Sequence, residues 1–192
     1  MLLRDQGESK TDPDARLYKK ATADKSVPSY QGHARRENRH GLVVATQASR
    51  SATAAECGAA LKRLDQVVKP AAQRAPEAEI TLGADTQYQD EKFIAARRER
   101  AVAPHVSEYT KGKASLGKTG LNEPERTDPR RPIGQQKRKL IEWVFGWSKL
   151  DRPLQQVKVR GLKRVDWFYR LVVTACNLTR LGKLIPIPAQ VG

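Results

Sequence analysis

The spacing of apolar residues along the chain changes several times, and each spacing predicts an element. Segments 29–38 and 42–46 carry apolar and β-branched residues on either side of a turn that ends in Gly41. They predict a β-hairpin. Two later runs, 79–85 and 102–109, are short, apolar and bounded by polar residues. They predict two further strands.

Four other stretches have helical spacing. The first opens with a capping box formed by Thr53 and Glu56 and stops at Pro70, and Asp90 is placed to cap the second. The expected helices are 53–70, 90–100, 136–149 and 165–181. In the last helix the following residues share one face: Val165, Phe168, Val172, Cys176 and Thr179.

This order of elements predicts an α/β fold in which helices flank a mixed sheet. The length of 192 residues suits one domain or part of a larger one. We expect a poorly ordered N-terminal segment over 1–28, a domain over 29–184 and a tail over 185–192. Residues 110–134 are rich in Gly, Pro, Lys and Arg and predict a long basic loop within the domain.

The helix predicted over 136–149 is amphipathic. Residues from Leu140 to Trp147 form an apolar face at helical spacing, and beside it Arg138, Glu142 and Lys149 form one stripe. A carboxylate between cations on a helix is most often an ordinary ion pair that contributes a few tenths of a kcal/mol. The same arrangement also suits a catalytic acid with basic helpers.

The charge of the chain points to a polyanionic partner. The net charge is +15, and from residue 129 onward 14 Lys and Arg face 3 Asp and Glu, which gives +11 of that total. Nucleic acid is the natural partner for such a region, although a generically basic surface would show the same excess. The basic residues that we expect to contact DNA phosphate are Lys137, Lys139, Arg160, Lys163 and Arg164.

Several other chemistries have no support in the sequence. The two cysteines stand inside helical patterns, which favours buried thiols in a reducing compartment, and the three histidines are scattered. No Cys and His cluster has zinc spacing, no signal peptide follows Met1, and no apolar run could cross a membrane. We expect a cytoplasmic protein, associated with the nucleoid when it is bound to DNA, with no small-molecule substrate.

A second acid stands at the end of the strand predicted over 79–85. A carboxylate at a strand end and another on a facing helix can share divalent metal ions, and paired metals stabilise an in-line phosphoryl displacement. Asp85 and Glu142 are therefore a candidate metal pair, and Mg²⁺ suits carboxylate ligands of this kind. Asp85 alone would more simply be a solvated acid at a strand end.

Two acidic motifs stand in order along the chain, each with particular neighbours. The first is Leu82-Gly83-Ala84-Asp85 with Tyr88, and the second is the Arg138, Glu142 and Lys149 pattern followed by Val144-Phe145-Gly146-Trp147. Together with flanking stretches between residues 12 and 184, they resemble insertion-sequence transposases of the DDE class. The resemblance implies an RNase H-like fold, DNA transposition by cleavage and strand transfer, and a mobile element as the source of the chain.

The resemblance also implies roles for particular residues. Asp85 would be the second acid and Glu142 the third, and both would bind Mg²⁺ or Mn²⁺. Arg138 and Lys149 would contact DNA phosphate or orient Glu142. The implied partners are the DNA ends of the element and, in an assembled complex, further copies of the chain.

The sequence departs from the family pattern in two places. Gln135 stands where the family has a Tyr, and no residue matches the first acid, which the family carries on its first, central strand. Asp5, Asp12 and Asp14 suit turns or the surface better than that strand. We therefore expect a truncated transposase that lacks its first central strand and is inactive alone.

Two other functions stay open. A non-catalytic basic protein that binds nucleic acid would need only salt-sensitive affinity, whereas a transposase needs a divalent cation and both acids. Residues 112–119 also fit the phosphate-binding pattern of P-loop proteins letter for letter. A flexible basic loop explains that stretch better, because the prolines that follow it do not suit the required helix.

Overall fold

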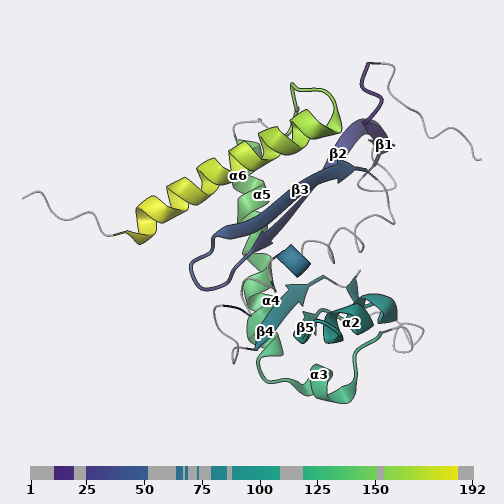
Figure 1. Cartoon of the computed structure of the whole chain (residues 1–192), viewed down its shortest axis with the longest axis vertical. Coiled ribbons are helices and arrows are strands. Elements are labelled where there is room, and N and C mark those ends of the chain that lie inside the picture. The colour runs from purple at the N-terminus through teal and green to yellow at the C-terminus, as the bar shows by residue number, and fades with distance from the viewer. Residues whose placement is uncertain are drawn as a thin grey trace, which may run out of the picture. The chain divides into compact units, whose positions relative to one another are not determined.

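The computed structural model describes residues 11–19, 25–51, 64–66, 68, 73, 79–85, 88–108, 119–150 and 154–185. The elements, shown in Figure 1, are β1 (Arg16–Tyr18), β2 (Val27–Arg36), β3 (Val43–Arg50), β4 (Ile80–Ala84), α2 (Glu91–Arg98), β5 (Val102–Val106), α3 (Glu123–Thr127), α4 (Arg131–Lys139), α5 (Ile141–Leu150) and α6 (Leu162–Leu184). The predicted mixture of helices and strands is confirmed. Within the described residues the strands form two sheets, one antiparallel and one parallel.

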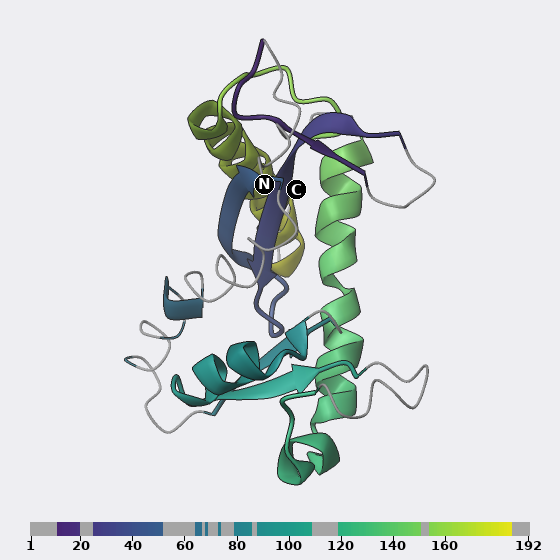
Figure 2. The same cartoon turned by 90° about the vertical axis from the view of Figure 1, so that its right-hand side faces the viewer.

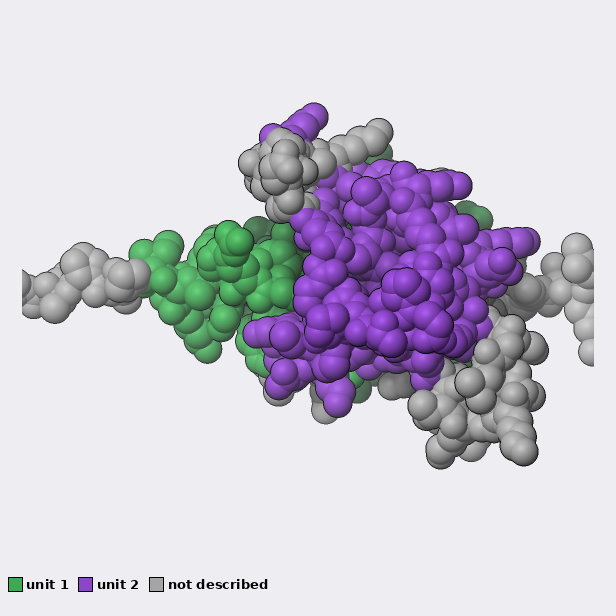
Figure 3. Space-filling view, turned by 90° about the horizontal axis from the view of Figure 1, so that it is seen from below, with its two compact units in different colours: residues 1–55, 142–192 green, residues 56–141 purple. Residues whose placement is uncertain are grey.

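The chain divides into two compact units, although the sequence predicts one domain over 29–184. Unit 1 consists of residues 1–55 and 142–192, and unit 2 consists of residues 56–141 (Figure 3). Unit 1 is therefore built from two stretches that are distant in sequence, whereas unit 2 is continuous.

The sheet of unit 1 contains the predicted hairpin. β2 pairs antiparallel with β3, with Tyr30 opposite Arg50, and β1 pairs with the start of β2. The carboxylate of Glu37 closes the hairpin turn because it accepts the backbone N–H groups of Arg39, His40 and Leu42 at 2.7 to 2.9 Å. Because β1 lies within 1–28, the expectation of poor order does not hold for that part of the segment.

Helix α6 packs on this sheet through one apolar face. The residues of α6 that are buried are Val165, Tyr169, Val172, Val173 and Cys176. This confirms three of the five positions predicted for the inner face, whereas Thr179 is exposed. The ring of Tyr169 lies over Gly32 of β2, where an added Cβ would be 3.2 Å from the ring.

Polar side chains of α6 also bond to the backbone of β3. The amide of Asn177 accepts the N–H of Val43 and donates to its carbonyl, both at 2.8 Å, and Asp166 accepts the N–H of Ala48 at 2.7 Å. Since β3 is an edge strand of its sheet, these groups would otherwise have no strand partner among the described residues. Helix α6 therefore forms hydrogen bonds with the backbone groups at the edge of β3 and also covers the apolar face of the sheet.

The first turn of α6 is capped by a distant segment. Its N-cap residue, Gly161, has a positive φ of 84° and no side chain to bond the free N–H groups. Asp12 accepts the N–H of Gly161 at 3.2 Å, and Asp14 accepts that of Leu162 at 2.9 Å. Tyr30 of β2 donates to Asp12 at 2.8 Å and fixes this segment on the sheet.

Unit 2 is built around two parallel strands, β4 and β5, which lie side by side in Figure 2. Its hydrophobic core joins Ala84, Ile94, Val106 and Leu121. Asp90 caps α2 as the sequence predicts, because its side chain accepts the N–H groups of Lys92 and Phe93.

A buried arginine joins helix α2 of unit 2 to the two strands of that unit. Arg97 of α2 has no exposed surface, and its guanidinium donates to the carbonyls of Leu82 and Ala103 at 2.8 and 3.0 Å. It also lies 5.6 Å from the ring centroid of Phe93, within the range of a cation–π contact. The charged end that the sequence indicates for this helix is therefore partly internal.

The prediction of one helix over 136–149 is wrong. α4 begins at Arg131, with Pro132 in its first turn, and ends at Lys139; the N–H of the C-cap residue Leu140 bonds to the carbonyls of Lys137 and Arg138. This tightened turn separates α4 from α5. Helices α3 and α4 both begin inside 110–134, so the expected long loop is wrong for the described residues 123–134.

Some predictions fall largely outside the described residues. In the helix predicted over 53–70, only 64–66 and 68 are described, and they are helical. Of the stretch 112–119 only Thr119 is described, and of the tail 185–192 only Ile185. Within the described part of the chain, none of the helices combines the length and apolar character that a bilayer crossing requires.

Candidate functional site

Asp85 lies where the sequence places it, directly after β4. Its side chain is 56% exposed, and its backbone carbonyl accepts the N–H of Tyr88 at 3.0 Å. The guanidinium Nη1 of Arg138, on α4, lies 3.6 Å from a carboxylate oxygen of Asp85. The structure therefore brings together two of the four predicted catalytic residues, Asp85 and Arg138, and it does so within unit 2.

Two glycines allow this approach of helix to strand. A Cβ added to Gly83 would lie 2.9 Å from the carbonyl oxygen of Gly134 and 3.4 Å from the Cβ of Arg138. A Cβ added to Gly134 would lie 2.3 Å from Nδ1 of His105. Because both residues are glycines, α4 can approach the strands closely. This close approach lets Arg138 reach Asp85.

Gln135 binds the ends of both parallel strands. Its amide nitrogen donates to the carbonyl of His105 and, at 3.4 Å, to that of Ala84, while its oxygen accepts from Ser107 and from Nε of Arg138 at 3.1 Å. In the sequence this residue is notable only as a departure from the family pattern. In the structure it connects the backbone before Asp85 to the guanidinium beside that acid.

Glu142 and Lys149 belong to α5. All of this helix except its first residue, Ile141, is part of unit 1. The side chain of Glu142 is exposed in the first turn of the helix, where a negative charge is favoured by the helix dipole. The ordinary stabilising role and a metal-binding role are both compatible with this position.

The five basic residues expected to contact DNA are all exposed. Lys137 and Lys139 lie on α4 in unit 2, whereas Arg160, Lys163 and Arg164 lie at the start of α6 in unit 1. The second group is notable because cations at the N-terminus of a helix oppose its dipole. Helix α6 has no acid in its own first turn, and the carboxylates of Asp12 and Asp14 supply the negative charge at its N-terminus instead.

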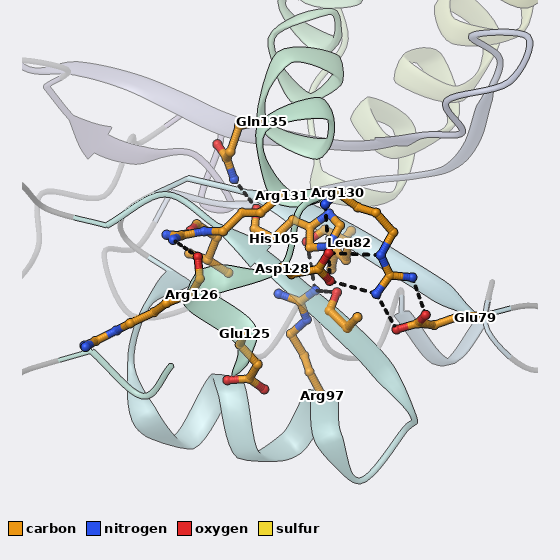
Figure 4. A network of polar contacts seen from close by, with 12 residues as sticks. Glu79, Leu82, Arg97, His105, Glu125, Arg126, Asp128, Arg130, Arg131 and Gln135 are labelled. Atoms are coloured by element: carbon orange, nitrogen blue, oxygen red, sulfur yellow. Dashed lines mark hydrogen bonds and ion pairs between the residues drawn. The ribbon is translucent and has the colours of Figure 1, made fainter. Parts of the chain in front are cut away.

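A polar network that the sequence does not indicate lies beside Gln135 (Figure 4). His105, at the end of β5, is 2% exposed, and its Nε2 lies 3.3 Å from Asp128. Arg130 donates to Asp128 at 2.7 Å and to Glu79 at 3.0 Å. A scattered set of histidines in the sequence therefore includes one that forms a His–Asp pair.

The chemistry of this pair is structural. The other ring nitrogen of His105 is buried against Gly134, and it has no hydrogen-bond partner among the residues that the structure describes. The Arg130 guanidinium, aided by its backbone N–H, holds the pKa of Asp128 far below its usual range. Arg130 lowers the pKa of Glu79 as well. The network fixes the turn before α4 to β5, and so supports the position of Arg138.

No group of three or more His, Cys, Asp or Glu side chains in the described ranges is arranged to hold a metal ion. Asp85 belongs to unit 2, and Glu142 belongs to unit 1.

No protein-family model matches the chain, and no curated protein or solved structure is significantly similar to it.

Proposed function

We propose that the chain is part of the catalytic domain of a DDE-class transposase, and that Asp85 and Glu142 are ligands for Mg²⁺ or Mn²⁺ in DNA cleavage and strand transfer. The observation that carries the proposal is the setting of Asp85. It is an exposed acid at the carboxyl end of a parallel strand, held beside an arginine of the motif that also contains Glu142. Ligands in open α/β sheets bind at this end of the strands.

The surroundings of Asp85 support a role beyond folding. An exposed ion pair contributes little to stability, yet two glycines without room for a Cβ and a glutamine with four contacts hold its partner in place. This rigid support is what a metal ligand or a phosphate-binding arginine requires. Asp85 would hold the metal ion, and Arg138 beside it could bind a DNA phosphate.

The finer fold is part of the same proposal. An antiparallel hairpin followed by a parallel pair of strands, with an acid directly after the first of that pair, suits an RNase H-like sheet. No residue of the sequence matches the first acid of the family, so we expect the chain alone to bind metal and DNA without cutting DNA.

The test measures metal binding and cleavage on the same preparations. We expect Mn²⁺ binding, followed by electron paramagnetic resonance, to weaken about tenfold or more in Asp85→Asn and Glu142→Gln, because each removes a charged ligand. Glu99→Gln is the matched control, since that glutamate is 76% exposed and lies elsewhere. Mn²⁺ affinity equal in all four proteins would contradict the proposal.

The cleavage assay tests the expected inactivity. Supercoiled plasmid is incubated with Mn²⁺ and each protein, and we expect no nicking above background. A nick that needs Mn²⁺ and disappears in Asp85→Asn would show that the two acids suffice. That result would refute inactivity while supporting the transposase chemistry.

The alternative function is a non-catalytic protein that binds nucleic acid. The exposed cations at the start of α6 favour it, because they can neutralise phosphates with no metal. In that case DNA affinity falls steeply with salt, is the same with and without Mn²⁺, and is unchanged in Asp85→Asn.

A further inference from the structure

Helix α6 has a second apolar face, opposite the face that packs on the sheet. Figure 1 shows the helix lying along β3, and the inner residues from Val165 to Cys176 are buried there. On the outer side Trp167 is 63% exposed, Leu171 50% and Leu178 63%. A helix with one covered face normally carries polar residues on the other, so this outer face calls for an explanation.

The outer residues follow the repeat of a coiled coil. They are Trp167, Leu171, Thr174, Leu178, Leu181 and Ile185, and we call them the outer seam. The intervals along the seam are four, three, four, three and four residues, which are the intervals between the core positions of a heptad. All but Thr174 are apolar, and the seam is about 27 Å long at 1.5 Å per residue.

The positions that flank the outer seam are nearly free of charge. They are Phe168, Arg170, Ala175, Asn177, Gly182 and Leu184. Only Arg170 is charged, in a chain in which 30% of residues are charged. A surface that faced only water or DNA would not be depleted of charge in this way, whereas the core of a protein interface is.

We propose that the outer seam pairs antiparallel with the outer seam of a second copy of this chain. In that alignment Trp167 lies opposite Ile185 of the other copy. Leu171 lies opposite Leu181, and Thr174 lies opposite Leu178. Each contact occurs twice about the two-fold axis, as a symmetric dimer requires.

The flanking residues fit the same alignment. Phe168 faces the other copy's Gly182, and Ala175 faces its own counterpart, so bulk meets a small residue on one side of the seam. On the other side Arg170 faces Leu184, and no like charges meet. A parallel pair would instead place the basic first turns, with Lys163 and Arg164, next to each other and would align the two helix dipoles unfavourably.

A second copy is also the occupant that the charge favours. DNA would need cations along the seam, whereas the seam and its flanking positions together contain only one charged residue, Arg170. One helix pair is a small interface, so we expect a reversible dimer in the micromolar range. The proposal is independent of the proposed function.

The experiment is sedimentation equilibrium of the full chain across about 1 to 200 μM, the range that brackets a weak interface. Nuclease treatment and 0.5 M salt prevent nucleic acid from bridging two copies. We expect the mass to rise from that of the 21.5 kDa chain towards twice that value. Leu171→Glu and Leu178→Glu should each weaken the dimer at least tenfold, whereas Thr179→Glu, an exposed site on the same helix outside the seam, should not. Circular dichroism confirms that each variant is folded.

A mixing experiment tests the direction of pairing. Leu171→Glu and Leu181→Lys should each be monomeric alone and dimeric when mixed, because the antiparallel alignment places the new charges opposite one another. Recovery on mixing Leu171→Glu with Leu171→Lys instead would show parallel pairing and overturn the alignment. A parent chain that is monomeric throughout, or a dimer that both glutamate variants leave intact, would overturn the proposal.

Discussion

The two units hold their helices to their strands in different ways. In unit 1, side chains of α6 bond to backbone groups at the edge of β3, where no neighbouring described strand binds them. A side chain of the segment before β1 bonds in the same way to a backbone N–H at the start of α6. In unit 2, a buried arginine and a buried histidine bond within the core, and a charged network surrounds them. The first arrangement satisfies backbone groups at the ends and edges of elements, whereas the second depends on the polar side chains of Arg97 and His105, which have almost no contact with water. The two units should therefore respond to different substitutions.

The largest expected effect is in unit 2. Arg97→Ala removes two hydrogen bonds to strand carbonyls and leaves a cavity, and we expect a loss of about 3 to 5 kcal/mol in unfolding free energy. Hydrogen exchange should accelerate in β4 and β5 more than in β2 and β3. Lys92→Ala on the same helix is the control, because that side chain is exposed. Equal acceleration in both sheets would show that the units unfold as one.

A smaller effect is expected in unit 1. Asn177→Ala leaves the N–H and the carbonyl of Val43 without their side-chain partner, and we expect a loss of about 1 to 3 kcal/mol. The three tryptophans, Trp143, Trp147 and Trp167, all belong to unit 1, so their fluorescence during urea unfolding reports this change.

Two further variants sharpen the test at Asn177. Thr179→Ala should change little, since its hydroxyl bonds only within its own helix. Asn177→Asp keeps the acceptor for the Val43 N–H but turns a carboxylate oxygen towards the Val43 carbonyl, and this repulsion should make it at least as damaging as Asn177→Ala. An unfolding curve for Asn177→Ala that overlays that of the parent chain would contradict the tethering role.

The smallest expected effect is on the stability of unit 2 at acidic pH. The folded pKa values of Asp128 and Glu79 lie below those of the unfolded chain because of Arg130. Their stabilising contribution is therefore complete above about pH 5 and is lost as the pH falls through the folded values. Asp128→Asn should reduce the loss of helical circular dichroism between pH 4 and pH 2, and Glu99→Gln should leave it unchanged. A profile for Asp128→Asn that matches the parent chain would show that the network contributes nothing to acid sensitivity.

The features that the sequence predicts correctly are local. The hairpin, the strand that ends at Asp85 and the cap at Asp90 each depend on residues a few positions apart, so spacing and turn chemistry are enough. The break between α4 and α5 is not predicted, because the apolar spacing runs through Leu140 without interruption. A helix-like pattern does not show where a turn tightens.

The features that the sequence does not predict depend on distant partners. Asp12 and Asp14 look like turn acids, yet they cap a helix that begins 148 residues or more beyond them. His105 and Asp128 are 23 residues apart, and only the packing of α4 on β5 brings them together. The role of Gln135 likewise depends on its contacts with the ends of two strands that are distant in sequence. One signal was available for this packing: a glycine in a strand, as at Gly83, often marks a close approach of backbone.

The discontinuity of unit 1 has a consequence on the ribosome. Residues 43–48 of the edge strand bond to side chains 118 and 134 residues later in the chain, so the edge has to wait for α6 to be translated. At about 5 to 20 residues per second, that interval lasts roughly 6 to 27 seconds. All of unit 2 is synthesised meanwhile, and its contacts can form from residues already present. The nascent chain therefore carries an uncovered strand edge for most of its production, and in this interval a chaperone would have its greatest influence on yield.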